Sequence, residues 1–369
     1  MDMSYLRPLY RRPGPWASVY LDVTRAEENA DHQIELRWRA ARQTLEEQGA
    51  DPATLDALSS AIADSGQLSG RAGLALFANG GEVVLAEPLP TPPPEEIADF
   101  GPLPHVMPLI AQRGEEVPYV VAEVHRDRAD VTGLGVGGVE RKRNVQGSET
   151  FPIRKVQAGG WSHRRYQQAA EETWKRNAGD VAAAVAELAS TVGAEVIVLA
   201  GEEHATSYTS SQLPERWRDR VVFVEGNKGE EGLDEATTIA VAEIADRHAR
   251  AAIDRYQAQR GDGYESSGLA DVVTRLQRGQ VETVLLVNDA SSTDTLWIGP
   301  DDPTLVSVDQ FELRDSGVND PRKVRADAAL VRAIAATDAD LVLVEPDEVP
   351  LTHGIGAVLR YRDGQTAAV

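Results

Sequence analysis

The chain has no cysteine among its 369 residues. This absence excludes disulfides, thiolate nucleophiles and zinc or iron–sulfur sites that are held by cysteine. Long apolar runs are also absent: the sequence contains no stretch of about 18 apolar residues, the length that a membrane-spanning helix needs, and its first residues lack the apolar core of a secretion signal. We therefore expect a cytoplasmic protein that neither spans a membrane nor is exported.

Positive charge is in the minority, and the formal net charge is −22. An acidic surface repels a phosphate backbone, so the average charge argues against a nucleic-acid partner. Exposed charges farther apart than about 10 Å are largely screened at physiological salt, however, and a local basic segment can still bind RNA. The distribution of charge along the chain is therefore more informative than its sum.

The composition is typical of a folded globular chain, with 42% hydrophobic and 26% charged residues. At roughly 100–200 residues per domain, this length corresponds to two or three domains, and we expect three. Predicted strands alternate with predicted helices throughout, which indicates an α/β fold. The predicted domains are 1–115, 116–230 and 231–369.

Hydrophobic periodicity and turn residues place the elements within these domains. The first domain is predicted to hold a strand at 15–25, helices at 30–48 and 52–64, and a hairpin of strands at 72–77 and 82–86. The second is predicted to hold strands at 119–125, 129–134, 196–200 and 221–225, a long helix at 166–190 and a linker at 226–232. The third is predicted to hold helices at 234–259, 269–276 and 322–336, and strands at 283–287 and 341–344.

Several short motifs match known catalytic signatures only in part. Residues 133–138 fit the Gly-x-Gly-x-x-Gly pattern, but residues 140–152 are charged and turn-rich instead of helical, so we interpret the glycines as a hairpin or bulge. Residues 125–127 are interpreted as a polar turn and His204 as a loop residue after a strand. No His-Glu-x-x-His helix face is present. We therefore expect no metal and no cofactor.

The most informative segment is 140–165, which reverses the charge of the rest of the chain. It contains only two acidic residues, Glu140 and Glu149, against seven basic ones: Arg141, Lys142, Arg143, Arg154, Lys155, Arg164 and Arg165. Lysine and arginine release counterions from nucleic acid, so the segment indicates a phosphate-binding element. The alternative is a solvated basic loop.

Within this segment, two adjacent glycines and two aromatic residues precede the long helix. Gly159 and Gly160 allow backbone conformations that side chains forbid. Trp161 and His163 are residue types that stack on unpaired bases, which is how proteins commonly bind non-helical RNA. The alternative is a buried Trp161 that packs at the start of the helix.

The segment resembles the Gly-Gly-Gln loop of archaeo-eukaryotic class I release factors, with Gly159 and Gly160 at the glycines and Trp161 at the glutamine. Residues 353–361, HGIGAVLRY, are similar to the Gly-Ile-Gly-Ala-Ile-Leu-Arg-Tyr ending of release factors and Pelota. Residues 268–286 resemble the same family's helix–Gly-x-Val-Glu–strand segment. The correspondences follow the family's order from about 118 to 361.

This resemblance implies a central RNase H-like domain and a C-terminal α/β domain of the release-factor/Pelota type. The first domain is divergent and has no Asn-Ile-Lys-Ser segment, so stop-codon reading is not expected. The pattern is most similar to the bacterial branch, which includes mycobacterial latency-associated proteins and the hibernation factor Balon. That resemblance implies binding in the ribosomal A site near the peptidyl transferase centre, with elongation factor Tu as a candidate partner and no membrane partner.

The resulting hypothesis is a non-hydrolytic factor that occupies idle or stalled ribosomes, because tryptophan replaces the glutamine of the hydrolytic loop. Its candidate ribosomal RNA-binding residues are Arg141, Lys142, Arg143, Arg154, Lys155, Gly159, Gly160, Trp161, His163, Arg164 and Arg165. One alternative is a peptidyl-tRNA hydrolase that rescues stalled ribosomes. Another is a metal-dependent nuclease that uses Asp127, Asp130 and Glu171, although their spacing specifies no two-metal site.

Overall fold

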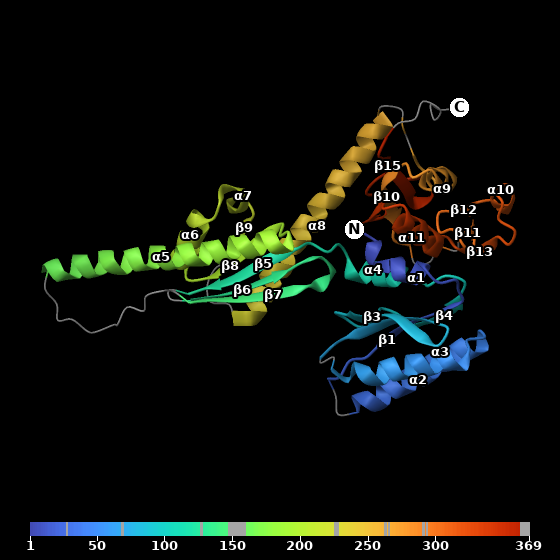
Figure 1. Cartoon of the computed structure of the whole chain (residues 1–369), viewed down its shortest axis with the longest axis horizontal. Coiled ribbons are helices and arrows are strands. Elements are labelled where there is room, and N and C mark those ends of the chain that lie inside the picture. The colour runs from blue at the N-terminus through green and yellow to red at the C-terminus, as the bar shows by residue number, and fades with distance from the viewer. Residues whose placement is uncertain are drawn as a thin grey trace. The chain divides into compact units, whose positions relative to one another are not determined.

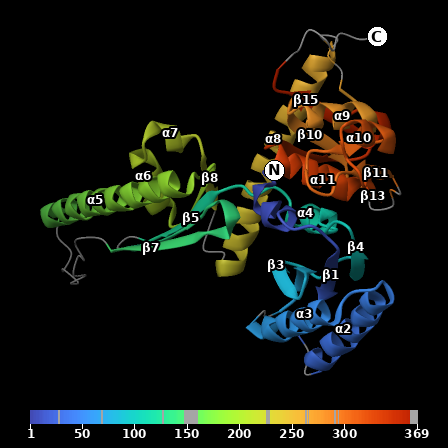
Figure 2. The same cartoon turned by 45° about the vertical axis from the view of Figure 1, so that its right-hand side comes forward.

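The computed structural model describes most of the chain and divides it into two compact units. The described residues are 1–26, 29–67, 70–125, 128–146, 160–224, 229–261, 264, 266–289, 292 and 294–361, with the backbone alone at 67, 160–174 and 230. The first unit combines Met1–Gly114 with Ala249–Val369, and the second is Glu115–His248. Figures 1 and 2 label their elements. Among the described residues, no helix is both long and apolar enough to cross a bilayer.

A four-stranded antiparallel sheet forms one layer of the first unit. Its order is β3-β2-β1-β4, with bounds Glu82–Leu89, Gly73–Asn79, Trp16–Asp22 and Ile97–Gly101. Alternate residues of β1 point to opposite faces. Val19 and Leu21 pack against helices α2 (Ala30–Glu47) and α3 (Pro52–Asp64), whereas Trp16 and Tyr20 belong to the core on the other face.

The C-terminal part of the first unit contains two three-stranded sheets. The order β14-β10-β15 comprises Asp340–Val344, Val281–Val287 and Ile355–Leu359, and the order β12-β11-β13 comprises Val306–Ser307, Thr295–Ile298 and Arg322–Arg325. The helices are α9 (Leu269–Gln277), α10 (Gln310–Asp315) and α11 (Ala326–Ala336), with a short helix η4 at Thr352–Gly354. The last turns of helix α8 (Gly229–Gly261) add Ile253 and Tyr256 to a core with Leu285 and Val358.

The start of the chain is part of this C-terminal core. Short helices η1 (Ser4–Leu6), α1 (Arg7–Tyr10) and α4 (Met107–Arg113) contribute buried Leu6, Leu9 and Leu109 to the same cluster as Leu330 and Ile334 of α11. The Met1 amino group donates to the Leu341 carbonyl at 2.9 Å, and Arg7 Nε donates to the Ala335 carbonyl at 3.0 Å. One continuous core therefore joins both ends of the chain.

The second unit is a five-stranded mixed sheet between helices. Its order is β7-β6-β5-β8-β9, with bounds Glu140–Gln146, Arg128–Leu134, Tyr119–Val124, Val196–Gly201 and Val221–Val224. Strands β5, β6 and β7 are antiparallel neighbours, and β8 and β9 run parallel to β5. Helix α5 (Gly160–Val192) packs on one face through Val185 and Ala189, and α8 packs on the other through Leu233 and Ile244.

The predicted α/β class is confirmed, together with most of the predicted helices and strands. Strands β4, β7, β11, β12, β13 and β15 were not predicted, and neither were helices α1, α4, α6 (Glu203–Gln212), α7 (Glu215–Arg218) and α10. The three-domain division stays a prediction. Its boundary after residue 230 falls within the first turn of α8.

Four local predictions were wrong. Residues 140–146 form a strand instead of a turn-rich segment, and 322–325 form a strand before helix α11 begins. Residues 229–232 of the predicted linker belong to α8, and His204 lies in α6 instead of a loop. The structural interpretation of the glycine motif is confirmed, because a single turn, η3 (Val136–Gly138), connects β6 to β7 with Gly137 at φ 75°.

Candidate functional site

The β6–β7 hairpin forms the edge of the second unit's sheet and carries the first three predicted RNA-binding residues. The register pairs Val131 with Arg143 and Thr132 with Lys142. Since directly paired residues share a face, Arg143 lies on the α5 side with buried Val131, and Lys142 lies on the opposite side. The hairpin thus presents basic side chains on both faces.

The remaining predicted residues belong to the connection from β7 to α5 and to the first turns of α5. Gly160, Trp161, His163, Arg164 and Arg165 have helical backbone, so α5 begins earlier than the predicted residue 166. Their side chains lie outside the described part. Arg154, Lys155 and Gly159 lie outside the described residues altogether.

The N-terminal half of α5 extends beyond the sheet, as Figure 1 shows. Ala178 lies beside the end of β5, where it lines a pocket with Val124. Arg164 precedes Ala178 by 14 helical residues, which at 1.5 Å per residue corresponds to on the order of 20 Å. The structure therefore brings Arg164 and Arg165 onto a projection of the second unit. We call residues 147–165 the tip.

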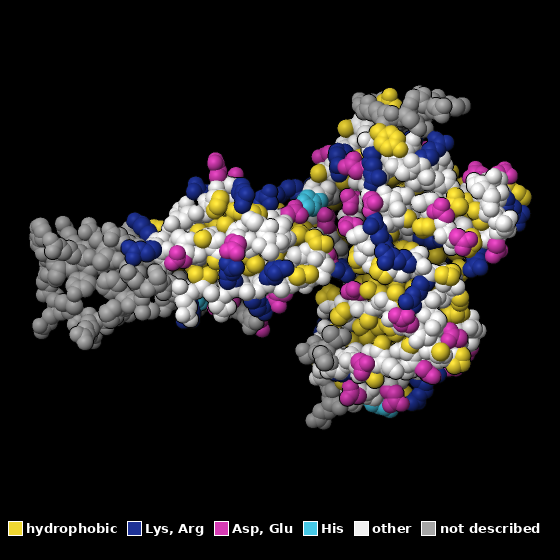
Figure 3. All heavy atoms as spheres, in the orientation of Figure 1, with side chains coloured by type: hydrophobic (Ala, Val, Ile, Leu, Met, Phe, Trp, Pro, Cys, Tyr) yellow, Lys and Arg dark blue, Asp and Glu magenta, His cyan; other side chains and the backbone are white. Residues whose placement is uncertain are grey.

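Two of the three basic residues of β7 are already paired within the chain. Lys142 Nζ lies 3.0 Å from Glu140 Oε1, and Arg143 binds both carboxylate oxygens of Glu187 on α5 at 2.6 and 2.9 Å. Arg141 forms no ion pair within the described part of the chain. On the visible face of the second unit, basic and acidic side chains are interspersed (Figure 3). Of the basic residues of the 140–165 segment, Lys142 and Arg143 are therefore compensated within the second unit.

The Arg143–Glu187 pair gives a prediction for a single titrating group. Hydrogen bonds from Arg143, and then its charge, hold the pKa of Glu187 below its ordinary value of 4.5. We expect Arg143→Met to raise the pKa of Glu187 towards the ordinary value, measured by NMR titration of the carboxyl carbon. Because the folded-state pKa is depressed, the pair stabilises the fold above the unfolded-state pKa and loses its effect as the pH falls through the lower folded value.

A matched control for this titration is Arg141→Met, which removes an arginine two residues earlier that has no ion pair in the described region. The pKa of Glu187 should stay depressed in that variant. If the pKa of Glu187 is the same in Arg143→Met as in the wild-type protein, this ion pair does not persist in solution.

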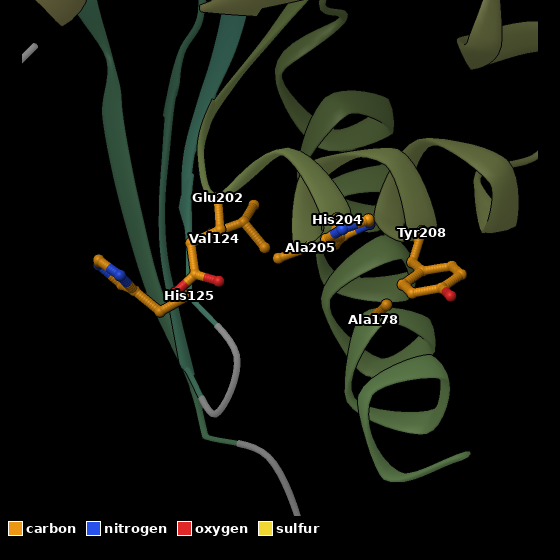
Figure 4. Close-up of a pocket in the computed structure, with 7 residues that line it drawn as sticks. All are labelled: Val124, His125, Ala178, Glu202, His204, Ala205 and Tyr208. Atoms are coloured by element: carbon orange, nitrogen blue, oxygen red, sulfur yellow. The ribbon is translucent and has the colours of Figure 1, made fainter. Parts of the chain in front are cut away.

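A small pocket lies where the parallel strands β5 and β8 end, the position at which α/β sheets commonly bind ligands. Figure 4 shows Glu202, His204 and Tyr208 around it, with His125 on the neighbouring strand end. The imidazole of His125 points away from helix α6. Within the described residues, no three acidic or histidine side chains are grouped so that they could hold a metal ion. The ionisable groups at this pocket therefore do not converge on one point.

The nuclease alternative depends on acids that the described residues do not bring together. Asp130 is exposed and alternates along β6 with Ala129 and Val131, which are buried on the α5 side. Its side chain is therefore on the sheet face opposite α5, the helix that contains Glu171. Asp127 lies outside the described residues. The geometry gives no support to a two-metal site that uses Asp130 and Glu171.

The two C-terminal sequence matches are adjacent in the first unit, although about 80 residues separate them. Gly268 N donates to the Ile355 carbonyl at 2.9 Å, and Arg360 N donates to the Gln280 carbonyl at 2.8 Å. Residues 355–359 form the fully buried strand β15. These signatures are therefore structural: backbone hydrogen bonds pair one segment with the other.

Comparisons with known proteins identify relatives of this chain. A family model for bacterial archaeo-eukaryotic release factor family 2 matches residues 118–262. The uncharacterized protein Rv2629 of Mycobacterium tuberculosis strain H37Rv is 31% identical, covering 98% of this chain and 97% of the relative. The uncharacterized protein MT2704 of M. tuberculosis strain CDC 1551 gives the same values.

Solved structures with similarity to the chain include two archaeal ones. The crystal structure of the archaeal translation termination factor aRF1 is 16% identical, covers 97% of this chain and 96% of its own, and has a TM-score of 0.25. A model of ribosome-bound archaeal Pelota and ABCE1 is 15% identical, covers 98% and 94%, and has a TM-score of 0.39.

The M. tuberculosis relatives match nearly the full chain, and the family model covers the second unit's sheet, the tip and the whole of α8. The α/β units described above therefore belong to a release-factor-like protein. The chain is a member of bacterial archaeo-eukaryotic release factor family 2.

Proposed function

We propose that this chain binds the A site of idle or stalled ribosomes and contacts ribosomal RNA through its tip, without hydrolysing peptidyl-tRNA. Family membership supports a role on the ribosome, because release factors act there. The strand order of the second unit supports the expected RNase H-like description of the central domain. A ribosome-binding protein of this kind acts in the cytoplasm.

The observation that carries the proposal is the projecting half of α5, which places the backbone of Arg164 and Arg165 beyond the sheet of the second unit. Lys142 and Arg143 are neutralised by carboxylates of the second unit, so they add less to an RNA contact than their number suggests. A positively charged projection can enter folded RNA where the net charge of −22 would otherwise repel it. Binding should therefore depend strongly on salt.

Trp161 supports the absence of hydrolysis. Hydrolysis of peptidyl-tRNA requires a water held close to the ester carbonyl and stabilisation of the developing oxyanion. An indole has one hydrogen-bond donor, no acceptor and much greater bulk than a carboxamide. We propose that Trp161 stacks on RNA or fills the pocket instead of positioning water. Elongation factor Tu remains the candidate GTPase partner.

Ribosome sedimentation tests the binding. The purified protein should pellet with vacant ribosomes at low salt and be released as the salt concentration rises, with a linear decrease of log affinity against log salt. Serum albumin, which is also acidic, serves as a control for trapping in the pellet. Absence of the protein from the low-salt pellet would refute the proposal.

A peptide-release assay separates this proposal from the alternative of a rescue hydrolase, which the retained Gly159 and Gly160 favour. We expect no peptide release from stalled complexes by the wild-type protein. Trp161→Gln restores the residue type of the hydrolytic loop, and release by this variant alone would assign the missing activity to Trp161. Release by the wild-type protein would establish the hydrolase instead.

A further inference from the structure

A pocket in the first unit is formed by segments from both ends of the chain. Its walls come from residues 9–14 and 16, from residues 102–103, from the end of β11 and the residues after it, and from Arg322 and Arg332. Its volume is about 180 Å³, on the order of ten times the space that one water molecule requires. The pocket can therefore accept a small organic molecule.

Arg332 of helix α11 is the buried cation of this pocket and is only 3% exposed. Its Nη1 donates to the Gly299 carbonyl at 2.9 Å and its Nη2 to the Pro300 carbonyl at 3.1 Å. A guanidinium has five N–H donors, and Arg332 forms no ion pair with a carboxylate anywhere in the described chain. Burial lowers the pKa of Arg332, and the nearby carboxylates of Asp302 and Asp301 act in the opposite direction without forming an ion pair with it.

Tyr10 provides a buried donor without an acceptor in the same wall. Its hydroxyl is buried, and it has no hydrogen-bond partner among the described residues. Burial raises the pKa of Tyr10 far above its ordinary value, so the hydroxyl keeps its proton and can donate. The positive charge of nearby Arg332 acts in the opposite direction and favours a lower pKa of Tyr10. The pocket thus holds a buried hydroxyl without an acceptor and a buried guanidinium whose hydrogen-bond partners are backbone carbonyls.

The rest of the pocket combines further arginines with an apolar surface. Arg12 is paired with Glu82 at 2.7 Å and Arg322 with Asp320 at 3.4 Å, whereas Arg11 forms no ion pair in the described region. The acidic lining residue is Asp301. The apolar part of the lining consists of Leu9, Pro13, Trp16, Pro102, Leu103, Ile298 and Pro300. Such a lining suits a compact apolar body that carries one acidic group.

We propose that this pocket binds a small organic anion, whose phosphate or carboxylate oxygens accept hydrogen bonds from Arg332 and Tyr10 while its apolar part packs against Trp16 and Leu103. The anion supplies a direct ionic partner for Arg332, which forms no ion pair in the described residues, and an acceptor for the Tyr10 hydroxyl. The site lies within the first unit and involves no residue of the tip. It is therefore a ligand site separate from the proposed ribosome contact.

Calorimetry and thermal melting of the full-length protein test the site with three probes of similar shape. Phenyl phosphate and benzoate carry the two candidate acidic groups, and benzyl alcohol carries the same ring without charge. We expect at least one anion to bind and to raise the melting temperature, whereas benzyl alcohol should not. Equal binding of benzyl alcohol and the anions, or no binding of either anion, would overturn the proposal.

Two substitutions assign the binding to the proposed donors. Arg332→Met removes a buried charge while keeping the length of the side chain, and Tyr10→Phe removes an unpaired hydroxyl, a change that should not destabilise the fold. A hydrogen bond to a charged group contributes enough that each change should weaken anion binding about tenfold or more. The matched control is Arg250→Met at an exposed position on α8. Anion affinity that is unchanged in both Tyr10→Phe and Arg332→Met would refute the assignment.

Discussion

Replacing Gly201 with alanine is expected to destabilise the second unit by at least about 3 kcal/mol. Gly201 ends strand β8 with φ 130°, and a Cβ atom added there would lie 2.0 Å from the carbonyl oxygen of Val124. Val124 and Gly201 are register partners of the parallel β5–β8 pair. Relief of the clash therefore requires separation of the two central strands, and hydrogen exchange at β5 and β8 amides should accelerate strongly.

Gly193→Ala is the control for this prediction. Gly193 also has a positive φ, of 70°, but an added Cβ would have nothing within 4 Å. The change should therefore cost only the strain of a left-handed residue, about 1–2 kcal/mol. Similar hydrogen exchange in the two variants would show that the close approach of Val124 to Gly201 does not constrain the fold.

The sequence predicted the elements whose side chains carry a local signal. Val19 and Leu21 alternate with polar or opposite-facing residues along β1, and Ile34, Trp38 and Leu45 recur at helical spacing along α2. These patterns arise because one face of each element packs into a core. The α/β class followed from such local signals alone.

Two strands could not be predicted for a common physical reason. Strand β7 reads ERKRNVQ and β13 reads RKVR, with one apolar residue each, Val145 and Val324. Both are edge strands of their sheets. An edge strand is held largely by backbone hydrogen bonds to a single neighbour, and such bonds leave no pattern in the side chains. Their basic residues are also of the kind that protects an exposed edge from further pairing.

The candidate sites differ in how far the sequence reveals them. The excess of basic residues in 140–165 is visible without a structure, but the pairing of Arg143 with Glu187 joins residues 44 positions apart and depends on how α5 packs on the hairpin. The pocket of Tyr10 and Arg332 joins opposite ends of the chain. No local motif predicts a contact of that kind, and the signal that reveals it is a buried hydroxyl without an acceptor in the same pocket as a buried guanidinium that is bonded to backbone carbonyls only.

Reversing the charge of the tip is expected to remove most ribosome binding. The variant replaces Arg154, Lys155, Arg164 and Arg165 with glutamate. Each phosphate contact that is lost should reduce the slope of log affinity against log salt by about one, so the combined change should reduce it by about four. Affinity should fall by several orders of magnitude at low salt, where counterion release contributes most. Sedimentation across a salt series measures both quantities.

A second quadruple variant distinguishes the effect of the tip residues on ribosome binding from the effect of the protein's net charge. Glutamate at Arg250, Arg278, Arg314 and Lys323 changes the net charge by the same amount, at exposed positions of the first unit. Its salt slope should match that of the wild-type protein, since long-range repulsion between exposed charges is screened beyond about 10 Å. Lys142 and Arg143, which are paired with carboxylates of the second unit, keep their charge in both variants. Equal losses in both variants would therefore attribute binding to overall charge and contradict a specific RNA contact at the tip.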